Sequence, residues 1–148
     1  MANMADYLED ALIDEIFRTD SSWNKPTVLA MCLLTTAAID SDTGIFSAGT
    51  GVEVTDANGY AREDHPPADA NWAAPAGGDG VTSNVTLITF DTATGDFAPG
   101  SVIAIGITDN TNHNQGNLFF HGTITTTTTI LNTHIPQFGV GQVQITWA

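Results

Sequence analysis

The sequence predicts a mainly β protein: an antiparallel β-sandwich or jelly-roll-like domain that carries one short N-terminal amphipathic α-helix. Apolar and polar residues alternate along several short segments of the second half, and turn residues rich in Gly, Asn and Asp separate them. One stretch near the N-terminus has helical spacing instead. The chain has 148 residues, a length typical of one domain. We therefore expect a single domain over 1–148, with the helix in 1–18 and the β-sandwich in 25–148.

The predicted helix covers about residues 4–17. Its apolar residues Leu8, Leu12 and Ile16 recur at a spacing of four, which places them on one face of a helix. Acidic residues gather in its first half and Arg18 follows its end, an arrangement that the helix dipole favours. A lone helix of this length is marginal in water. Its apolar face therefore needs a cover, either the sheet of its own domain or a neighbouring subunit.

The first half of the chain holds one strongly apolar strand followed by a loop-rich stretch. Segment 27–35 is continuously apolar and follows Pro26, which predicts a strand buried on both faces. Glycine and proline are then frequent from about 37 to 80. Within this stretch we expect two short strands, at 51–54 and 60–63, and a turn at 56–59 that joins them.

More regular strands are predicted in the second half. Segment 101–108 is apolar on both faces, as expected for a central strand, and 117–124 is expected to pair with it across the polar loop 109–116. The threonine run 125–129 is interpreted as a strand or strand edge. A linker or an ice-binding array is disfavoured, because alternate residues of a strand point to opposite faces. Two further strands are expected, at 84–90 and at 141–147 with Val143, Ile145 and Trp147 on one face.

The charge of the chain excludes several classes of function. Seventeen acidic side chains face only Arg18, Lys25 and Arg62, which gives a formal net charge of −14. Because binding to phosphate relies on Lys and Arg, we expect no nucleic-acid partner and no anionic membrane partner. No segment approaches the roughly twenty apolar residues of a membrane helix. The N-terminus also lacks the features of a signal peptide, so synthesis in a cytosol is expected.

Residues that carry chemistry are sparse. The four histidines show no metal-ligand spacing, and the polar loop 109–116 lacks the distal Glu of an EF-hand. The single cysteine, Cys32, lies in an apolar run and is expected to be a buried, unreactive thiol. The sequence has no nucleophile elbow and no phosphate-binding loop. We therefore predict no catalytic residue, no cofactor and no metal.

Several short motifs follow one another along nearly the whole chain. Tyr-Leu-Glu at 7–9 opens a helix that ends in Ile-Phe at 16–17, and a Pro-started apolar strand follows at 26–35. The later motifs are Gly-Val-Glu-Val at 51–54, Gly-Tyr-Ala-Arg at 59–62, Trp72, strands at 84–90 and 102–109, Gly-Asn-Leu-Phe-Phe-His-Gly at 116–122, and Phe-Gly-Val-Gly at 138–141. In this order they resemble a family of small tailed-phage virion structural proteins. The resemblance implies a structural role in the virion and no chemistry.

From this resemblance and the acidic surface we expect a capsid decoration or cement protein, made in the cytoplasm of the bacterial host. It would bind the major capsid protein on the capsid exterior and associate with itself, as a homotrimer. The expected interface residues are Tyr7, Leu8, Leu12, Ile16, Trp23, Arg62 and Trp147. Arg62 is included because a rare cation in an acidic chain often makes a specific pair. The alternative for Arg62 is a surface ion pair with Glu63 or Asp64.

Two other functions remain open from the sequence. One is a tail component, such as a fibre, baseplate or adaptor subunit, which would be present in few copies. The other is a carbohydrate-binding module that stacks sugar rings on Trp23, Tyr60 or Trp72, although Tyr60 and Trp72 are expected to pack inside the fold.

Overall fold

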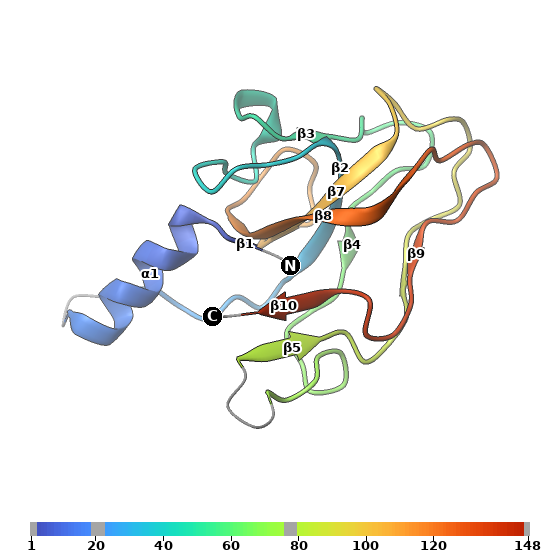
Figure 1. The fold of residues 1–148 in the computed structure, drawn as a ribbon. Coiled ribbons are helices and arrows are strands. Elements are labelled where there is room, and N and C mark those ends of the chain that lie inside the picture. Colours follow the sequence, from blue (N-terminus) through green and yellow to red (C-terminus); the bar gives the residue numbers. More distant parts are fainter. Residues whose placement is uncertain (1–2, 19–22, 76–79, 147–148) are drawn as a thin grey trace.

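The fold is built on one antiparallel sheet, seen in a computed structural model that describes residues 3–18, 23–75 and 80–146 (Figure 1). Its strands follow the order β1-β8-β7-β2-β3, and β4 also pairs with β2. They are β1 (Asn3–Met4), β2 (Ala30–Thr36), β3 (Val52–Glu53), β4 (Glu63–Asp64), β7 (Val102–Thr108) and β8 (Leu118–Thr128).

Shorter elements surround this sheet. Two small antiparallel sheets pair β5 (Val81–Ser83) with β10 (Gln144–Thr146), and β6 (Ile88–Thr89) with β9 (Gln137–Phe138). The helix α1 (Asp6–Phe17) projects from one side of the β-rich body, and a short 3-10 helix, η1 (Phe46–Ala48), precedes β3. This arrangement confirms the predicted mainly β, antiparallel, sandwich-like fold with one N-terminal helix.

Strand β7 lies at the centre of the main sheet, as its two apolar faces predicted. It pairs on one side with β2, where Cys32 lies opposite Gly106, and on the other with β8. Side chains alternate across the sheet, so Met31 and Leu33 of β2 enter one hydrophobic cluster while Cys32 and Leu34 enter a second cluster on the opposite face. The predicted strand at 27–35 is therefore confirmed over most of its length, and it is buried on both faces.

Cys32 and Gly106 meet where β2 and β7 cross the second cluster. A Cβ atom built on Gly106 would lie 2.7 Å from Cys32 Sγ, so glycine is needed for the close approach at this pair. The Cys32 side chain is fully buried, and burial raises the pKa of its thiol well above the ordinary value. The predicted burial of this cysteine is confirmed.

The larger cluster lies between the main sheet and the small sheets. Ile88, Phe90 and Val143 from the segments that contain the small sheets are buried in it, together with Tyr60 and Phe97. The turn that delivers Tyr60 was predicted correctly.

That turn bends at two residues. Asn58 and Gly59 both have positive φ, at 56° and 80°, and the Tyr60 N–H donates to the Ala57 carbonyl oxygen. The turn at 56–59, which the sequence signals locally, therefore sets the position at which the chain enters the core with Tyr60.

The prediction of a strand at 84–90 is wrong over much of that range. The structure has β5 before this range and the two-residue β6 inside it, separated by a loop. Asn84 causes the break: its buried side-chain amide donates to the carbonyl oxygens of Thr86 and Gly139, and its side-chain oxygen accepts the Val143 N–H. These side-chain bonds reach one nearby backbone group and two that lie more than fifty residues away in sequence, and they compete with the bonds of a regular strand.

Candidate functional site

The first turn of α1 is fixed to the main sheet. The Ala5 N–H donates to the Phe119 carbonyl oxygen at 2.9 Å, and the Asp6 N–H donates to the Asp40 carbonyl oxygen at 2.9 Å. The Tyr7 ring stacks on the Phe119 ring with 5.7 Å between centroids, and Leu8 is buried. Leu8 was expected at an intersubunit interface; the structure instead buries it inside its own subunit.

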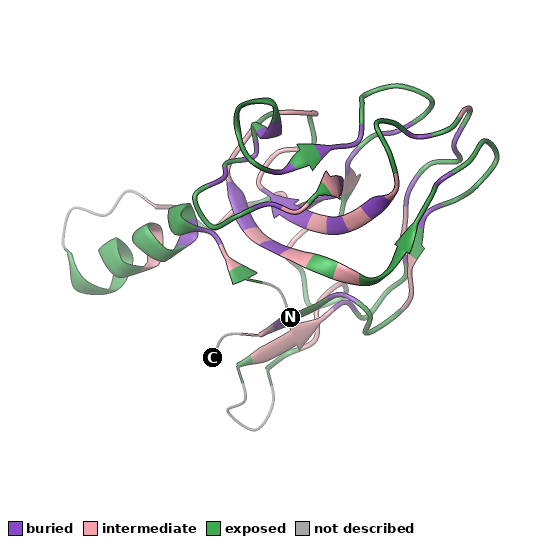
Figure 2. Cartoon of the chain, turned by 45° about the horizontal axis from the view of Figure 1, so that its top comes forward, coloured by how far each residue is buried: buried purple, intermediate pink, exposed green. Residues whose placement is uncertain are grey.

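The second half of α1 leaves its apolar residues uncovered. Leu12 is half-buried, whereas Ile13, Ile16 and Phe17 are 56%, 66% and 78% exposed. Figure 2 shows the helix as mostly exposed where it leaves the body of the protein. We call Leu12, Ile13, Ile16 and Phe17 the α1 stripe. Of these, Leu12 and Ile16 were expected interface residues from the sequence, while Phe17, the most exposed, was missed.

Acidic side chains accompany the α1 stripe. The helix carries Asp6, Glu9, Asp10, Asp14 and Glu15. At its end Arg18 forms an ion pair with Asp14, with 3.2 Å between Arg18 Nε and Asp14 Oδ1. The projecting helix is therefore apolar along one stripe and strongly acidic beside it.

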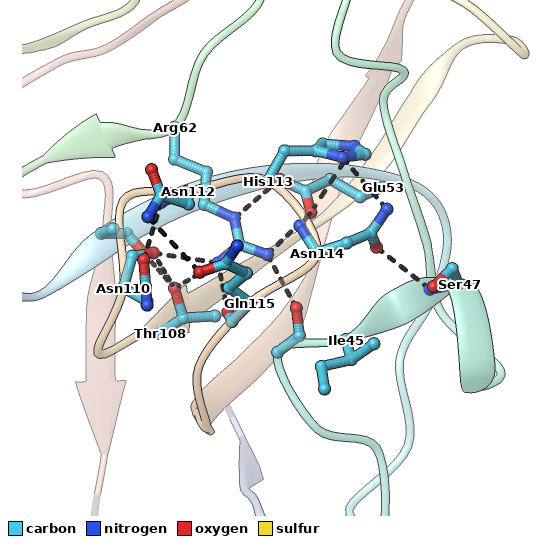
Figure 3. Close-up of polar contacts among 12 residues, drawn as sticks. Ile45, Ser47, Glu53, Arg62, Thr108, Asn110, Asn112, His113, Asn114 and Gln115 are labelled. Carbon is cyan, nitrogen blue, oxygen red and sulfur yellow. Dashed lines mark hydrogen bonds and ion pairs between the residues drawn. The ribbon is translucent and has the colours of Figure 1, made fainter.

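Arg62 lies inside the subunit, at the centre of the polar network in Figure 3. Its Nε donates to Glu53 Oε1 and its Nη2 to Glu53 Oε2, both at 2.8 Å. The alternative of a surface ion pair with Glu63 or Asp64 is wrong, because Arg62 is buried and pairs with Glu53; its interface role stays a prediction. The sequence signal for the true partner was an acid between two valines, Glu53 between Val52 and Val54.

The rest of the Arg62 guanidinium forms hydrogen bonds with three segments: β7, the loop 109–116 and the loop that contains Gly44. Its N–H groups donate to Thr108 Oγ1 at 3.0 Å and to the carbonyl oxygens of Gly44, Asn110 and Gln115 at 2.8 to 2.9 Å. Burial lowers the pKa of Arg62, but hydrogen bonding to Glu53 and electrostatic attraction from nearby groups together outweigh it and raise the pKa above the ordinary value. This network holds the loop 109–116 against β3, and its role is architectural.

Two of the aromatic residues considered for sugar stacking, Tyr60 and Trp72, pack within the fold. Tyr60 is buried, its hydroxyl donates to Glu53 Oε1 at 2.8 Å, and it accepts the Leu33 N–H at 3.0 Å. Trp72 is half-buried against the larger cluster, and its Nε1 donates to the His65 carbonyl oxygen at 3.2 Å. Trp23 is half-buried. Tyr60 therefore offers no stacking platform, and its expected packing inside the fold is confirmed. The remaining expected interface residue, Trp147, lies outside the described residues.

A groove runs beside the threonine-rich half of β8. Its volume is about 840 Å³, and its walls come from β8, from residues 134–138 and from residues 142–144. Apolar side chains such as Ile124, Ile135 and Phe138 alternate there with threonine and glutamine. The run 125–129 predicted as strand is confirmed through Thr128, where β8 ends.

Residues 3–18, 23–75 and 80–146 form neither a metal-binding cluster nor a membrane-spanning helix. There, no three His, Cys, Asp or Glu side chains gather where they could hold a metal ion. No helix in those ranges is both long enough and apolar enough to cross a membrane.

The fold and these surfaces define a small antiparallel β protein with a projecting acidic, amphipathic helix. The family model described as Podophage GP4 fiber I protein gp80 matches residues 3–146, and the chain belongs to this family. It is thus a bacteriophage structural protein and a component of the virion, which confirms the broad expectation from the sequence motifs. No curated protein is significantly similar to the chain.

Proposed function

We propose that this chain is a non-enzymatic fibre subunit of a podophage virion. The observation that carries the proposal is the family match, which covers residues 3–146 and whose description names a fibre. A fibre corresponds to the tail-component alternative considered from the sequence. Decoration of the capsid exterior through the major capsid protein has no comparable support.

In this proposal the α1 stripe attaches the fibre subunit to another virion protein. Ile13, Ile16 and Phe17 are more than half exposed on a helix whose first turn is fixed to its own sheet. An isolated helix of twelve residues is marginal in water, so a partner that covers its far half would stabilise it. Recognition of an amphipathic helix by an apolar groove is a common mode of protein association.

Charge defines the chemistry of that partner. Five acidic residues lie on α1, and its cation Arg18 is paired with Asp14. A second α1 packed on the stripe would bring like charges together, which opposes self-pairing of the helix. The partner that fits is a different protein with an apolar groove bordered by Lys and Arg. Binding through such charges weakens as salt concentration rises.

The first experiment measures location and copy number. Purified virions are labelled with antibody to this chain for electron microscopy, and the chain is quantified against the major capsid protein by mass spectrometry. A fibre subunit gives label on fibres and a small number of copies per particle. Label spread over the shell, with one copy for every one to three capsid proteins, would overturn the fibre proposal in favour of decoration.

A second experiment tests the α1 stripe itself. Phage carrying Ile16→Ser together with Phe17→Ser should assemble with at least a tenfold loss of this chain from virions, because the uncovered apolar contacts are removed. The matched control is Leu87→Ser, which replaces an apolar residue that is 52% exposed outside α1. Circular dichroism should show all variants folded. Retention of the double variant at the wild-type copy number would contradict attachment through α1.

A further inference from the structure

The charges of this chain are confined to its first 109 residues. From Asn110 to the end there is no Asp, Glu, Lys or Arg, so the formal net charge of −14 belongs entirely to residues 1–109. In the fold, the neutral segment supplies β8, β9 and β10. One part of an otherwise strongly acidic protein is therefore free of formal charge.

The groove beside β8 lies in this neutral part. None of its lining residues is Asp, Glu, Lys or Arg, including those contributed by β2 and β7. Ile135 both lines the groove and is half exposed, and nearby in sequence Leu131 and Val140 also expose much of their side chains. We call the groove and segment 124–128 of β8 the neutral face. It combines exposed apolar groups with hydroxyl and amide groups.

Part of strand β8 on the neutral face lies outside the ladders with its neighbouring strands. On its outer side, β1 pairs with β8 at Phe120 and His121. On the β7 side the register passes from Thr123 directly to Thr128, so 124–127 have no partner in either ladder within the described ranges. These residues are β-branched, and the segment contains none of the charges or prolines that usually protect a strand edge from pairing with another chain.

We propose that the neutral face binds a second copy of this chain. Two molecules of net charge −14 repel each other, and the repulsion is least where the approaching surfaces carry no charge. The neutral face meets that condition, and its strand segment outside the ladders and its exposed apolar side chains supply the attraction. This interaction is separate from the attachment of α1 and does not depend on the fibre role.

Sedimentation velocity of the purified full-length chain, at rising protein concentration and at low and high salt, tests the proposal. We expect a concentration-dependent oligomer that becomes more stable at high salt, because salt screens the repulsion between the acidic parts. Thr126→Asp places a charge in the groove and should weaken association about tenfold or more. Thr55→Asp, at an exposed threonine outside the neutral face, should leave association unchanged.

Cross-linking supplies an independent measurement. Thr126→Cys should form covalent dimers with a short bismaleimide, whereas Thr55→Cys should not. The wild-type chain is the control for background, because its single cysteine, Cys32, is buried. Urea unfolding of each variant checks that the fold is retained.

Three results would overturn the proposed self-association. The chain could remain a monomer at every protein and salt concentration. Thr126→Asp could leave the oligomer intact, or Thr55→Asp could weaken association as much as Thr126→Asp does. A monomer that instead binds a neutral polysaccharide through Thr126 would also overturn it. The Ile16→Ser, Phe17→Ser variant should sediment like the wild type, so failure of the α1 proposal and failure of this one are distinguishable.

Discussion

Replacing Arg62 with alanine should remove a large part of the stability of the fold. The guanidinium donates to both carboxylate oxygens of Glu53, and the exposed fractions of the two side chains are 0% and 1%. The remaining N–H groups donate to one hydroxyl and three backbone oxygens. Without Arg62, the Glu53 carboxylate becomes a buried charge without a counter-charge, and those oxygens lose a donor.

The size of the effect follows from these contacts. Breaking a buried ion pair by removing one partner costs about 3–5 kcal/mol. Glu53 keeps the Tyr60 hydroxyl at 2.8 Å and the Asn114 N–H at 3.3 Å, which reduces the penalty. We therefore expect a loss of about 3–4 kcal/mol in the free energy of unfolding. For a domain of this size, that corresponds to a fall in Tm of roughly 6–16 °C.

Urea unfolding followed by tryptophan fluorescence and circular dichroism measures this loss. The matched control is Arg18→Ala, which removes an exposed ion pair with Asp14 and should cost less than about 0.5 kcal/mol. Arg62→Lys should fall between the two, because lysine keeps the charge but not the two-pronged geometry. A loss below about 1 kcal/mol for Arg62→Ala, or equal losses for both alanine variants, would refute the reasoning.

Three other changes have defined outcomes. Gly106→Ala should lower the free energy of unfolding by roughly 1–3 kcal/mol in urea, because its methyl group would meet Cys32 Sγ; an unchanged midpoint would contradict this. Cys32 should react with a thiol reagent only when the chain is unfolded, so rapid labelling of the native protein would contradict its burial. Burial raises the pKa of Asp42, but three backbone N–H donors outweigh it and hold the pKa below its ordinary value of 3.8. The stability that Asp42 contributes is therefore present above that pH and is lost as the pH falls through the folded pKa, so Asp42→Asn should flatten the acid side of a stability curve measured by urea unfolding. An unchanged slope would count against this role of Asp42.

Local patterns predicted much of the fold because the forces that produce them act over a few residues. The helix was predicted by the spacing of Leu8, Leu12 and Ile16, and the central strand by apolar residues on both faces of 101–108. The turn at 56–59 was predicted by Asn58 and Gly59, which adopt positive φ there. Periodicity failed at 84–90, because the buried side-chain amide of Asn84 bonds to backbone groups more than fifty residues away.

The candidate interface was only partly predictable, for a related reason. Spacing identified the apolar stripe of α1, but it did not say which residues the sheet would cover. Leu8 is buried by contacts near Phe119, whereas Ile16 and Phe17 extend beyond the sheet. How far a helix overlaps its own domain depends on where the chain leaves β1, a tertiary feature that hydrophobic spacing does not encode.

The sequence by itself determined the helix, the buried central strands, the acidic character and the neutral C-terminal quarter, since each depends on residue type and short-range order. The tertiary structure alone decided the partner of Arg62 and the position of the groove. Arg62 has acids beside it in sequence at Glu63 and Asp64, yet it pairs with Glu53. An extended backbone directs Arg62 and Glu63 to opposite faces, and Asp64 is exposed whereas Arg62 is buried. A buried charge needs a partner, and the fold brings Glu53 within reach.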